Sequence, residues 1–467
     1  MWGSIVLVDG VKDILQKLVD CGQKFGAEFV DVRFEEVKSL NVRLVDGIPK
    51  IGYGVDRGVA IRVYYSGAIG FAYTSRLDWD NLRKTLERAF VLARASVGVS
   101  RAAKPIELKA VEDDVVWPLK RDPANVGLEE KLADVREVDK ILGSERFVKS
   151  RTVGYSESSV AKVYASSEGR LVSEKRTLVL VVAEAYAEEA GVRASAYKSN
   201  GSIKGYVVWE KMSPEKLANT VLDRLRKQLR AKTPKAGEFP VVLAPEAVGV
   251  FVHEAFGHLA EADLVAAGSV LKGKVGEKVA SSKVTIVDDP TIDDGFGTFK
   301  YDDEGVRTTK AVIVEKGVLK GYMTDRLYAS LLNIEPTGNG RAESYRVPPL
   351  VRMRNTLIEP GTNTVDELFE GISFGYYIVA VSGGQTNLDG GFQVGVGEAY
   401  EIVNGEVRDP VRNMSISGNT LDTLLNVDAV ANDLQIFYGH CGKGQLVPVS
   451  DGGPHIRVKK MTVGGRA

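Results

Sequence analysis

The chain has 467 residues, with 61 Lys and Arg against 62 Asp and Glu, 44% hydrophobic residues and two cysteines. A net charge of -1 argues against phosphate neutralisation over a broad surface, so we expect no nucleic-acid partner. Two cysteines cannot build a disulfide framework, and no apolar run approaches the roughly 18 residues of a transmembrane helix. The N-terminus also lacks the basic segment and apolar run of a secretory signal, so we expect a cytoplasmic protein without membrane contact.

The first hundred residues alternate helix and strand patterns. Helical spacing of apolar residues predicts a helix over residues 11–25, and alternation of charged and apolar residues predicts a half-buried strand over 29–45. Asp46-Gly47 predicts a turn, residues 58–74 read as a hairpin, and residues 77–97 return to a helix.

The next segment predicts an antiparallel meander followed by a helix. Three β-rich stretches, broken by Gly and Ser, cover 155–165, 170–187 and 191–209. Pro214 opens a helix that runs to about Lys232. The Pro- and Gly-containing segment 233–237 is the strongest linker signal, so we divide the chain into an N-terminal α/β domain, 1–235, and a C-terminal β-rich domain, 236–467.

The second half is dominated by strands and Gly-rich turns. A short strand at 239–243 precedes an apolar helix from Pro245, and a helix over 418–430 interrupts further strands at 284–289, 309–322, 379–384 and 392–403. The predicted class is α+β, with antiparallel or mixed sheets in both halves. Three acidic clusters have no EF-hand spacing and predict solvated turns: Asp288-Asp289, Asp293-Asp294 and Asp302-Asp303-Glu304.

Two of the four histidines fall five residues apart, in His253-Glu254-Ala-Phe-Gly-His258. Neutral imidazoles are good zinc ligands, and metallopeptidases place a glutamate general base beside a ligating histidine. The alternative is a core helix carrying two structural histidines. A five-residue offset separates two side chains by about 140° on an ideal helix. Sharing one ion therefore requires either a π-type bulge or a break of the helix at Gly257.

A tetrahedral zinc site needs at least one more protein ligand, and the chain offers several. Ligand softness favours Cys441, which glycines flank, although a lone loop thiol is the alternative. Chain spacing does not decide among the five chemically suitable residues, which are Glu261, Asp263, His440, Cys441 and His455.

These motifs occur together, in order, in a known family. The chain resembles the TldD/PmbA family of zinc metallopeptidases, and within it the catalytic TldD type. The resemblance rests on residues 253–263, on Gly338–Tyr345 with the following Arg352-Met-Arg-Asn-Thr, and on Gly439-His-Cys441-Gly-Lys-Gly. The N-terminal hairpin, with Arg57–Arg62 and Gly67–Thr74, is also similar, so the resemblance covers nearly the whole chain.

The resemblance implies a fold, a cofactor and a set of site residues. It implies an N-terminal α/β domain and a β-rich C-terminal domain that holds one zinc per chain. His253, His258 and Cys441 become the zinc ligands, and Glu254 becomes the general base. It also implies a dimer, either of two like chains or with a PmbA-type chain that lacks the metal motif.

The expected reaction is hydrolysis of peptide bonds in short or unfolded peptides by a zinc-bound water. Arg341 and Tyr345 are candidates for a second oxyanion donor. The alternatives are that Arg341 pairs with a structural carboxylate such as Glu343 or Asp389 and that Tyr345 packs in the core. Two other functions remain open: a zinc hydrolase for a non-peptide amide, and a non-catalytic subunit with structural zinc. A peptide substrate predicts an exposed strand edge near the zinc, which residues 379–403 could supply.

Overall fold

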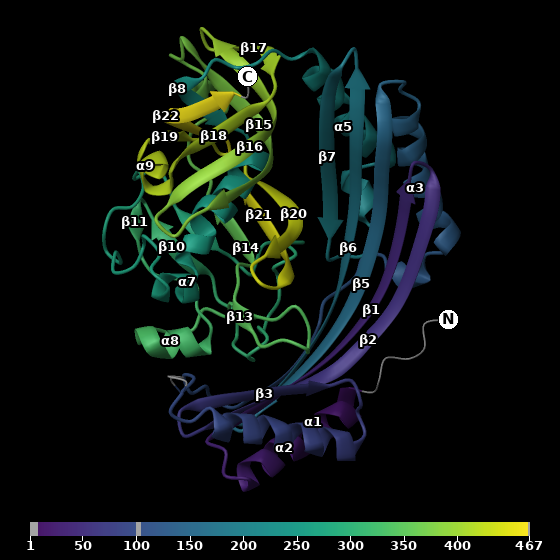
Figure 1. Ribbon diagram of the computed structural model, residues 1–467, viewed down its shortest axis with the longest axis vertical. Coiled ribbons are helices and arrows are strands. Elements are labelled where there is room, and N and C mark those ends of the chain that lie inside the picture. Colours follow the sequence, from purple (N-terminus) through teal and green to yellow (C-terminus); the bar gives the residue numbers. More distant parts are fainter. Residues whose placement is uncertain (1–7, 100–103, 466–467) are drawn as a thin grey trace.

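The computed structural model describes residues 8–99 and 104–465, and it confirms the α+β class (Figure 1). A long curved sheet from the N-terminal part faces a C-terminal part that contains the remaining sheets (Figure 1). No described helix combines the length and the apolar character that crossing a membrane requires. The division of the chain at residues 235 and 236 stays a prediction.

The N-terminal sheet has the strand order β3-β2-β1-β5-β6-β4, with β7 also paired to β6. All pairs of adjacent strands in this sheet are antiparallel, except that β4 and β6 are parallel. Its strands are β1 (Phe29–Val45), β2 (Ile48–Tyr65), β3 (Ala68–Thr74), β4 (Val111–Val116), β5 (Val148–Ser166), β6 (Arg170–Glu189) and β7 (Val192–Ser202).

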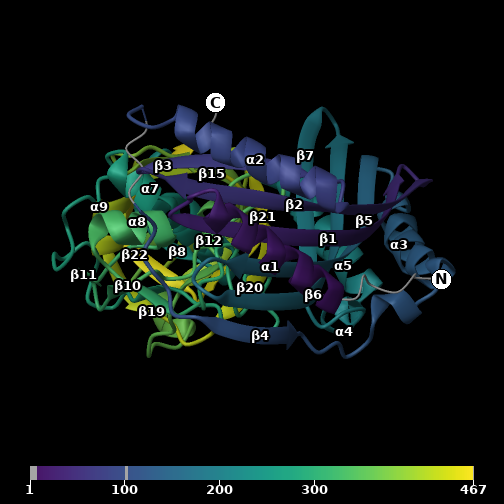
Figure 2. The ribbon, with the colours of Figure 1, turned by 90° about the horizontal axis from the view of Figure 1, so that it is seen from below.

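Helices cover the two ends of this sheet. Helices α1 and α2 bury one apolar cluster against β1, β2, β3 and β5, and α3 and α5 bury a second against β1, β5, β6 and β7. Figure 2 shows α1 and α2 lying across the sheet, away from α3. The helices are α1 (Val8–Lys24), α2 (Trp79–Ala95), α3 (Leu128–Gly143), α4 (Val208–Lys211) and α5 (Pro214–Arg230), with a 3₁₀ turn at Pro123–Asn125.

The predicted N-terminal elements are present, but some bounds differ and strand β4 is an addition that the sequence pattern does not predict. Asp46 and Gly47 turn the chain at φ of 51° and 82°, but β2 begins directly afterwards at Ile48, ten residues before the predicted hairpin. Helix α3 was not predicted. The third strand of the meander ends at Ser202, because the chain then turns into α4.

The first half of strand β1, residues 29–36, is buried on both faces, whereas its end alternates between buried and exposed residues as predicted. Asp31, Arg33 and Glu35 are only 3–4% exposed because the C-terminal part packs on their side of the sheet. Side chains of opposite charge lie beside them there. Arg62 bonds to Asp31 and forms an ion pair of 2.5 Å with Glu304 of the C-terminal part. The sequence shows the alternation but not the partner that covers the charged face.

The C-terminal part contains two larger sheets and a small one. One has the order β11-β10-β9-β14-β21-β20, and the other closes a ring because β15 pairs with both β8 and β16. Its strands are β8 (Gly237–Leu243), β9 (Ile286–Asp288), β10 (Ala311–Glu315), β11 (Val318–Leu319), β12 (Gly340–Arg341), β13 (Leu350–Val351), β14 (Asn355–Ile358), β15 (Phe374–Thr386), β16 (Gly391–Val403), β17 (Glu406–Val411), β18 (Met414–Asn419), β19 (Val427–Val430), β20 (Gln435–Gly442), β21 (Leu446–Gly453) and β22 (Ile456–Gly465).

Short helical segments pack between these sheets and form the largest apolar core. They are α6 (Pro245–Val250), a π turn at Phe251–Gly257, a 3₁₀ turn at His258–Ala260, α7 (Ala262–Ala266), α8 (Arg326–Leu332), a 3₁₀ turn at Asp366–Leu368 and α9 (Thr420–Leu425).

Two predictions for the C-terminal part are wrong. The helix expected over 418–430 is reduced to α9, because the residues on either side pair as β18 and β19. The acidic clusters are mainly buried rather than solvated: Asp288 is fully buried, and Asp302, Asp303 and Glu304 are less than 9% exposed. Backbone amides and basic side chains bond to these carboxylates. A local sequence pattern does not reveal such distant partners.

Candidate metal centre

The π turn brings the two motif histidines together. The backbone N–H of His258 donates to the carbonyl of His253, five residues earlier. The two imidazole centroids lie 5.3 Å apart, with their planes at 85°. Gly257 allows the turn to pack closely against the segment that carries Met353, since a Cβ there would overlap the Met353 sulfur. Of the two ways to accommodate the spacing, the π-type bulge is the one observed.

Cys441 joins the two histidines from the opposite side. It lies near the end of β20, the edge strand of its sheet, and its Sγ is 3.4 Å from His258 Nε2. One ligand atom each from His253, His258 and Cys441 lies within 4.8 Å of the others. Among the described residues, this is the group of three or more His, Cys, Asp or Glu side chains that could share a metal ion.

The other four candidate ligands have different partners. Glu261 Oε2 bonds to the outer nitrogen of His258, Nδ1, at 2.7 Å. Asp263 forms an ion pair of 2.8 Å with Lys443. His455 bonds to Asp433 at 2.7 Å and to the Tyr377 hydroxyl at 3.0 Å. His440 precedes Cys441 on β20 and lines a cavity between the two parts of the molecule.

The donor set fits zinc. Tetrahedral zinc with bonds of about 2.05 Å to nitrogen and 2.3 Å to sulfur separates those two ligand atoms by roughly 3.5 Å. The observed 3.4 Å between Cys441 Sγ and His258 Nε2 agrees with that separation. His258 also meets the usual requirement that a carboxylate hold the second ring nitrogen, here through Glu261.

The electrostatics of the cluster favour a thiolate. Burial raises the pKa of Cys441, but hydrogen bonds from His253 and His258 outweigh burial and lower it to about 5. Burial lowers the pKa of His258, but Glu261 and Cys441 outweigh it and raise that pKa to about 10. At neutral pH the cluster therefore pairs the Cys441 thiolate with a protonated His258, whose proton a bound metal would displace. Since the thiolate is the form that binds a metal, Cys441 is ready as a ligand at neutral pH.

Glu254 lies beside this cluster rather than in it. Its Oε2 is 3.9 Å from Nε2 of His258, the nitrogen that faces Cys441. Its side chain is 33% exposed, in contrast to the buried Glu261. A carboxylate at this place can reach a water molecule at the cluster and also exchange protons with the surroundings.

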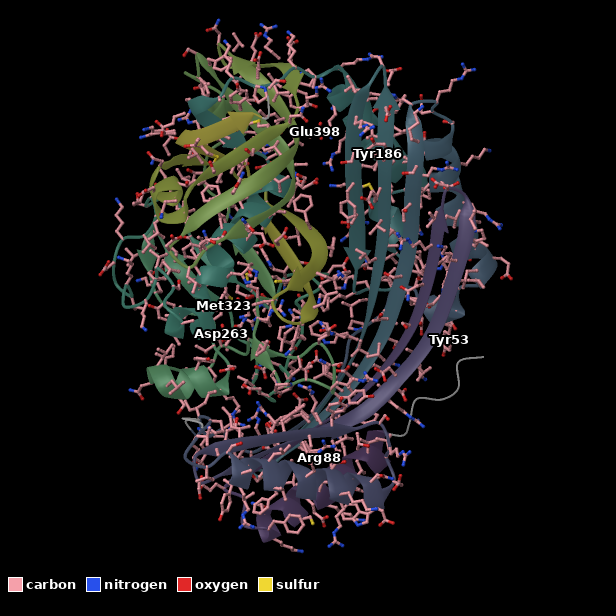
Figure 3. All side chains as sticks on the ribbon, viewed as in Figure 1. Tyr53, Arg88, Tyr186, Asp263, Met323 and Glu398 are labelled. Atoms are coloured by element: carbon pink, nitrogen blue, oxygen red, sulfur yellow. The ribbon has the colours of Figure 1, made fainter. Side chains whose placement is uncertain are left out.

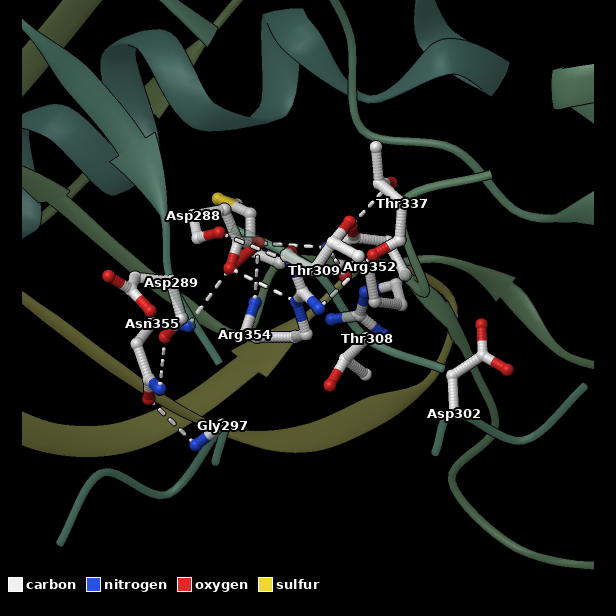
Figure 4. Close-up of polar contacts among 12 residues, drawn as sticks. Asp288, Asp289, Gly297, Asp302, Thr308, Thr309, Thr337, Arg352, Arg354 and Asn355 are labelled. Carbon is white, nitrogen blue, oxygen red and sulfur yellow. Dashed lines mark hydrogen bonds and ion pairs between the residues drawn. The ribbon is translucent and has the colours of Figure 1, made fainter. Parts of the chain in front are cut away.

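A buried network holds the strand segments around the cluster (Figure 4). Asp288 accepts bonds from the backbone N–H groups of Arg354 and Asn355 and pairs with the Arg354 guanidinium at 3.3 Å. Arg352 donates to the carbonyls of Cys441 and Gln445, each at 2.6 Å. The network thus fixes the hairpin that carries Cys441.

The two proposed oxyanion residues have partners elsewhere. Arg341 donates to the carbonyls of Met353 and Pro448, both at 2.6 Å, and pairs with neither Glu343 nor Asp389. The Tyr345 hydroxyl donates to Asp56 at 3.2 Å, and its ring packs over Gly58, so this residue joins the two parts of the molecule. Tyr345 is therefore buried in the packing, as its structural alternative expects, whereas Arg341 bonds to backbone carbonyls instead of the expected carboxylate.

Sequence reasoning missed the supporting role of several residues. Glu261 was considered only as a ligand, although its place three residues after His258 puts it on the same helical face. Lys443, two residues beyond Cys441, bonds to Glu261 at 3.0 Å and to Asp263. Figure 3 shows Asp263 next to Met323, at the lower end of the C-terminal part. Nothing in the local pattern identifies Lys443 or Arg352 as supports.

Known proteins resemble this chain over nearly its whole length. A zinc metalloprotease TldD homologue from Saccharolobus solfataricus is 37% identical over 462 residues, which cover 96% of this chain and 99% of that protein. A metalloprotease from Methanothermobacter thermautotrophicus is 38% identical, covering 94% and 96%.

Solved structures share the fold. TldE from Thermococcus kodakarensis has a TM-score of 0.79 at 20% identity and covers 97% of this chain and 100% of that chain. A Thermotoga maritima protein, named as a candidate modulator of DNA gyrase, has a TM-score of 0.80 at 24% identity with the same coverage. At these identities the likeness shows the fold alone.

Family models match in three segments. The model for PmbA/TldA metallopeptidase domain 1 matches residues 30–93, the central-domain model matches 121–229, and the C-terminal-domain model matches 236–465. The matches follow one another in order, and the C-terminal match includes the whole His–Cys cluster. The chain therefore belongs to the PmbA/TldD family of metallopeptidases.

Proposed function

We propose that this chain is a zinc-dependent peptidase that hydrolyses short or unfolded peptides. His253, His258 and Cys441 bind one zinc, and Glu254 is the general base. The observation that carries the proposal is the three-donor cluster, with the Glu254 carboxylate 3.9 Å from His258 Nε2. The names of the relatives, which include zinc metalloprotease, support the same activity.

The residues around the cluster have different roles in the proposed reaction. Zinc, when bound, supplies Lewis-acid activation of a water molecule and of the scissile carbonyl. Glu254 accepts a proton from the attacking water and passes it to the leaving amine, so that one peptide bond and one water give a carboxylate and an amine. Glu261 holds Nδ1 of His258, which directs Nε2 towards the metal.

The geometry favours catalysis over a purely structural zinc. A structural site is closed by four protein ligands, whereas a catalytic site keeps one position open. Asp263 and His440 are the residues that could supply a fourth ligand. Asp263 forms an ion pair with Lys443, and His440 lines a separate cavity. Among the described residues, three donors remain, with Glu254 alongside.

Peptide substrates can bind along a strand edge beside the cluster. Strand β20 carries Cys441 and is the edge of its sheet. Residues 379–386 of β15, within the stretch expected to supply an edge, pair only with β16 in the described part of the chain. An extended peptide can add to either edge through backbone hydrogen bonds. A folded domain would first have to unfold, which costs about 5–15 kcal/mol.

The test compares the wild type with Glu254→Gln on an unstructured polypeptide, with zinc measured in both. The wild type should cleave, and the variant should lose cleavage while retaining its zinc, because Glu254 is a base and not a ligand. Glu406→Gln, on an exposed hairpin, is the matched control and should cleave like the wild type. Normal cleavage by Glu254→Gln would refute the base assignment, and loss of zinc would make Glu254 a ligand.

A second comparison tests the substrate class. The same target segment is presented in an unstructured polypeptide and inside a stably folded domain. We expect cleavage of the first and resistance of the second. Equal rates would show that the site accepts folded proteins from an open groove.

A further inference from the structure

A cavity of about 310 Å³ lies between the N-terminal sheet and the C-terminal part. Strands β1, β5 and β6 form one wall, and residues 296–303, Arg341 and the β20–β21 hairpin contribute to the other. His440 lines this cavity, but His253, His258, Cys441 and Glu254 do not. Because neighbouring residues of a strand point to opposite faces, the cavity and the metal cluster lie on opposite sides of β20.

Two arginines in the cavity wall have no anionic partner. Arg176 donates to the carbonyl of Phe296 at 3.0 Å, and Arg341 donates to the carbonyls of Met353 and Pro448. Both guanidinium groups lie over the ring of Phe299, at 5.1 and 5.2 Å from its centroid. Among the described residues, neither arginine hydrogen-bonds to or forms an ion pair with a carboxylate.

The carboxylates near these arginines already have other partners. Glu174 accepts hydrogen bonds from the Trp117 indole at 2.6 Å and from two backbone amides. Asp303 pairs with Lys162 at 2.5 Å and accepts a bond from the Ala342 amide. Lys162 also lies 3.5 Å from Glu35. These three carboxylates carry more negative charge than Lys162 offsets, but none of them is in hydrogen-bond or ion-pair contact with either guanidinium group.

Burial without a counter-ion is costly for a guanidinium. Buried charges in proteins are usually paired, because desolvation is otherwise uncompensated. Burial, together with the neighbouring charge of Arg176, lowers the pKa of Arg341 to about 9. An anion in the cavity would relieve this cost, and a planar carboxylate matches the geometry of two guanidinium donors.

The rest of the wall is suited to an apolar group. Polar side chains make up about half of the wall, and the aliphatic and aromatic side chains include Val37, Val160, Leu178, Leu180, Phe296 and Val447. The volume is at the lower end of the range for small-molecule sites, about 300–1,000 Å³. We propose that this cavity binds a small organic carboxylate with an apolar body, the carboxylate lying between Arg176 and Arg341.

Calorimetric titration with N-acetyl-L-leucine and with N-acetyl-L-leucinamide tests the proposal on the full-length protein. The two probes share a shape, and only the first carries a charge. We expect the acid to bind at least ~10-fold more tightly than the amide, as a charge-assisted contact would require. Absence of binding by the acid, or equal affinity for the two probes, would overturn the proposal.

Two further measurements locate the binding. Arg176→Gln should weaken binding of the acid about 10-fold and leave the amide unchanged, whereas Arg193→Gln, on an exposed ion pair, should change neither. Chelation of the metal should leave binding of the acid intact. Loss of binding on chelation would place the carboxylate on the metal and refute the cavity. The comparison of acid and amide on the wild type decides the class of ligand even if Arg176→Gln does not fold.

Discussion

Replacing Glu261 with Gln should weaken zinc binding by about 10- to 100-fold, the usual effect of losing a residue that orients a metal-binding histidine. Glu261 is fully buried, and its Oε2 bonds to His258 Nδ1 at 2.7 Å and to Lys443 at 3.0 Å. Its Oε1 accepts the Met353 amide at 3.3 Å. A glutamine has one acceptor oxygen, so it cannot serve both the histidine and the Met353 amide.

The loss corresponds to about 1.4–2.8 kcal/mol of binding free energy, at 1.4 kcal/mol for each factor of ten. Competition with a chromophoric chelator measures it directly on the wild type and the variant. Asp263→Asn is the matched control, because Asp263 shares Lys443 with Glu261 but does not touch His258. Unchanged zinc affinity in Glu261→Gln would refute the orienting role. Equal loss in Asp263→Asn would assign the effect to Lys443 instead.

The remaining predictions concern a ligand, the packing and the pH dependence. Cys441→Ala should lower zinc content and peptide cleavage together, and full zinc occupancy would mean another third ligand. Gly70→Ala should destabilise the fold by more than about 2 kcal/mol in urea unfolding, because a Cβ there would overlap the backbone of α2. Gly10→Ala is the control, because a Cβ at this position in α1 meets open space, and it should be neutral or slightly stabilising. Equal unfolding midpoints would contradict the close packing. Glu246→Gln should cost roughly 1–3 kcal/mol at pH 7 through loss of its ion pair with Arg224. Although burial raises the pKa of Glu246, neighbouring cations lower it below its ordinary 4.5, so this contribution is complete above pH 4.5 and disappears as the pH falls through the folded-state value. A difference in stability that does not shrink as the pH falls below 4.5 through the acid range would contradict that origin.

The metal centre is the part of this molecule that the sequence describes best. Residue types alone indicate a zinc site at His253 and His258, and the five-residue spacing requires either a π bulge or a break at Gly257, between which only the structure decides. Cys441 lies 183 positions beyond His258, so only the fold can show that the two meet. The same limit applies to Arg352, whose contact with the Cys441 carbonyl depends on a hairpin 89 residues away.

The errors share a physical cause, which is burial by distant segments. Asp31, Arg33 and Glu35 look like the solvent face of a strand until the C-terminal part covers them. The acidic clusters between 288 and 304 look solvated until arginines and backbone amides surround them. Local patterns predicted most strands and helices, because alternation and helical spacing are local properties. The partner of a polar face is not a local property.

We propose that zinc held by His253, His258 and Cys441 is required for peptide cleavage. The most direct measurement removes metal with a chelator, titrates zinc back in, and follows cleavage of an unstructured polypeptide at each addition. We expect cleavage to disappear on chelation and to return in proportion to added zinc, reaching a plateau at about one zinc per chain. Cleavage that persists without metal, or that does not return with zinc, would contradict it.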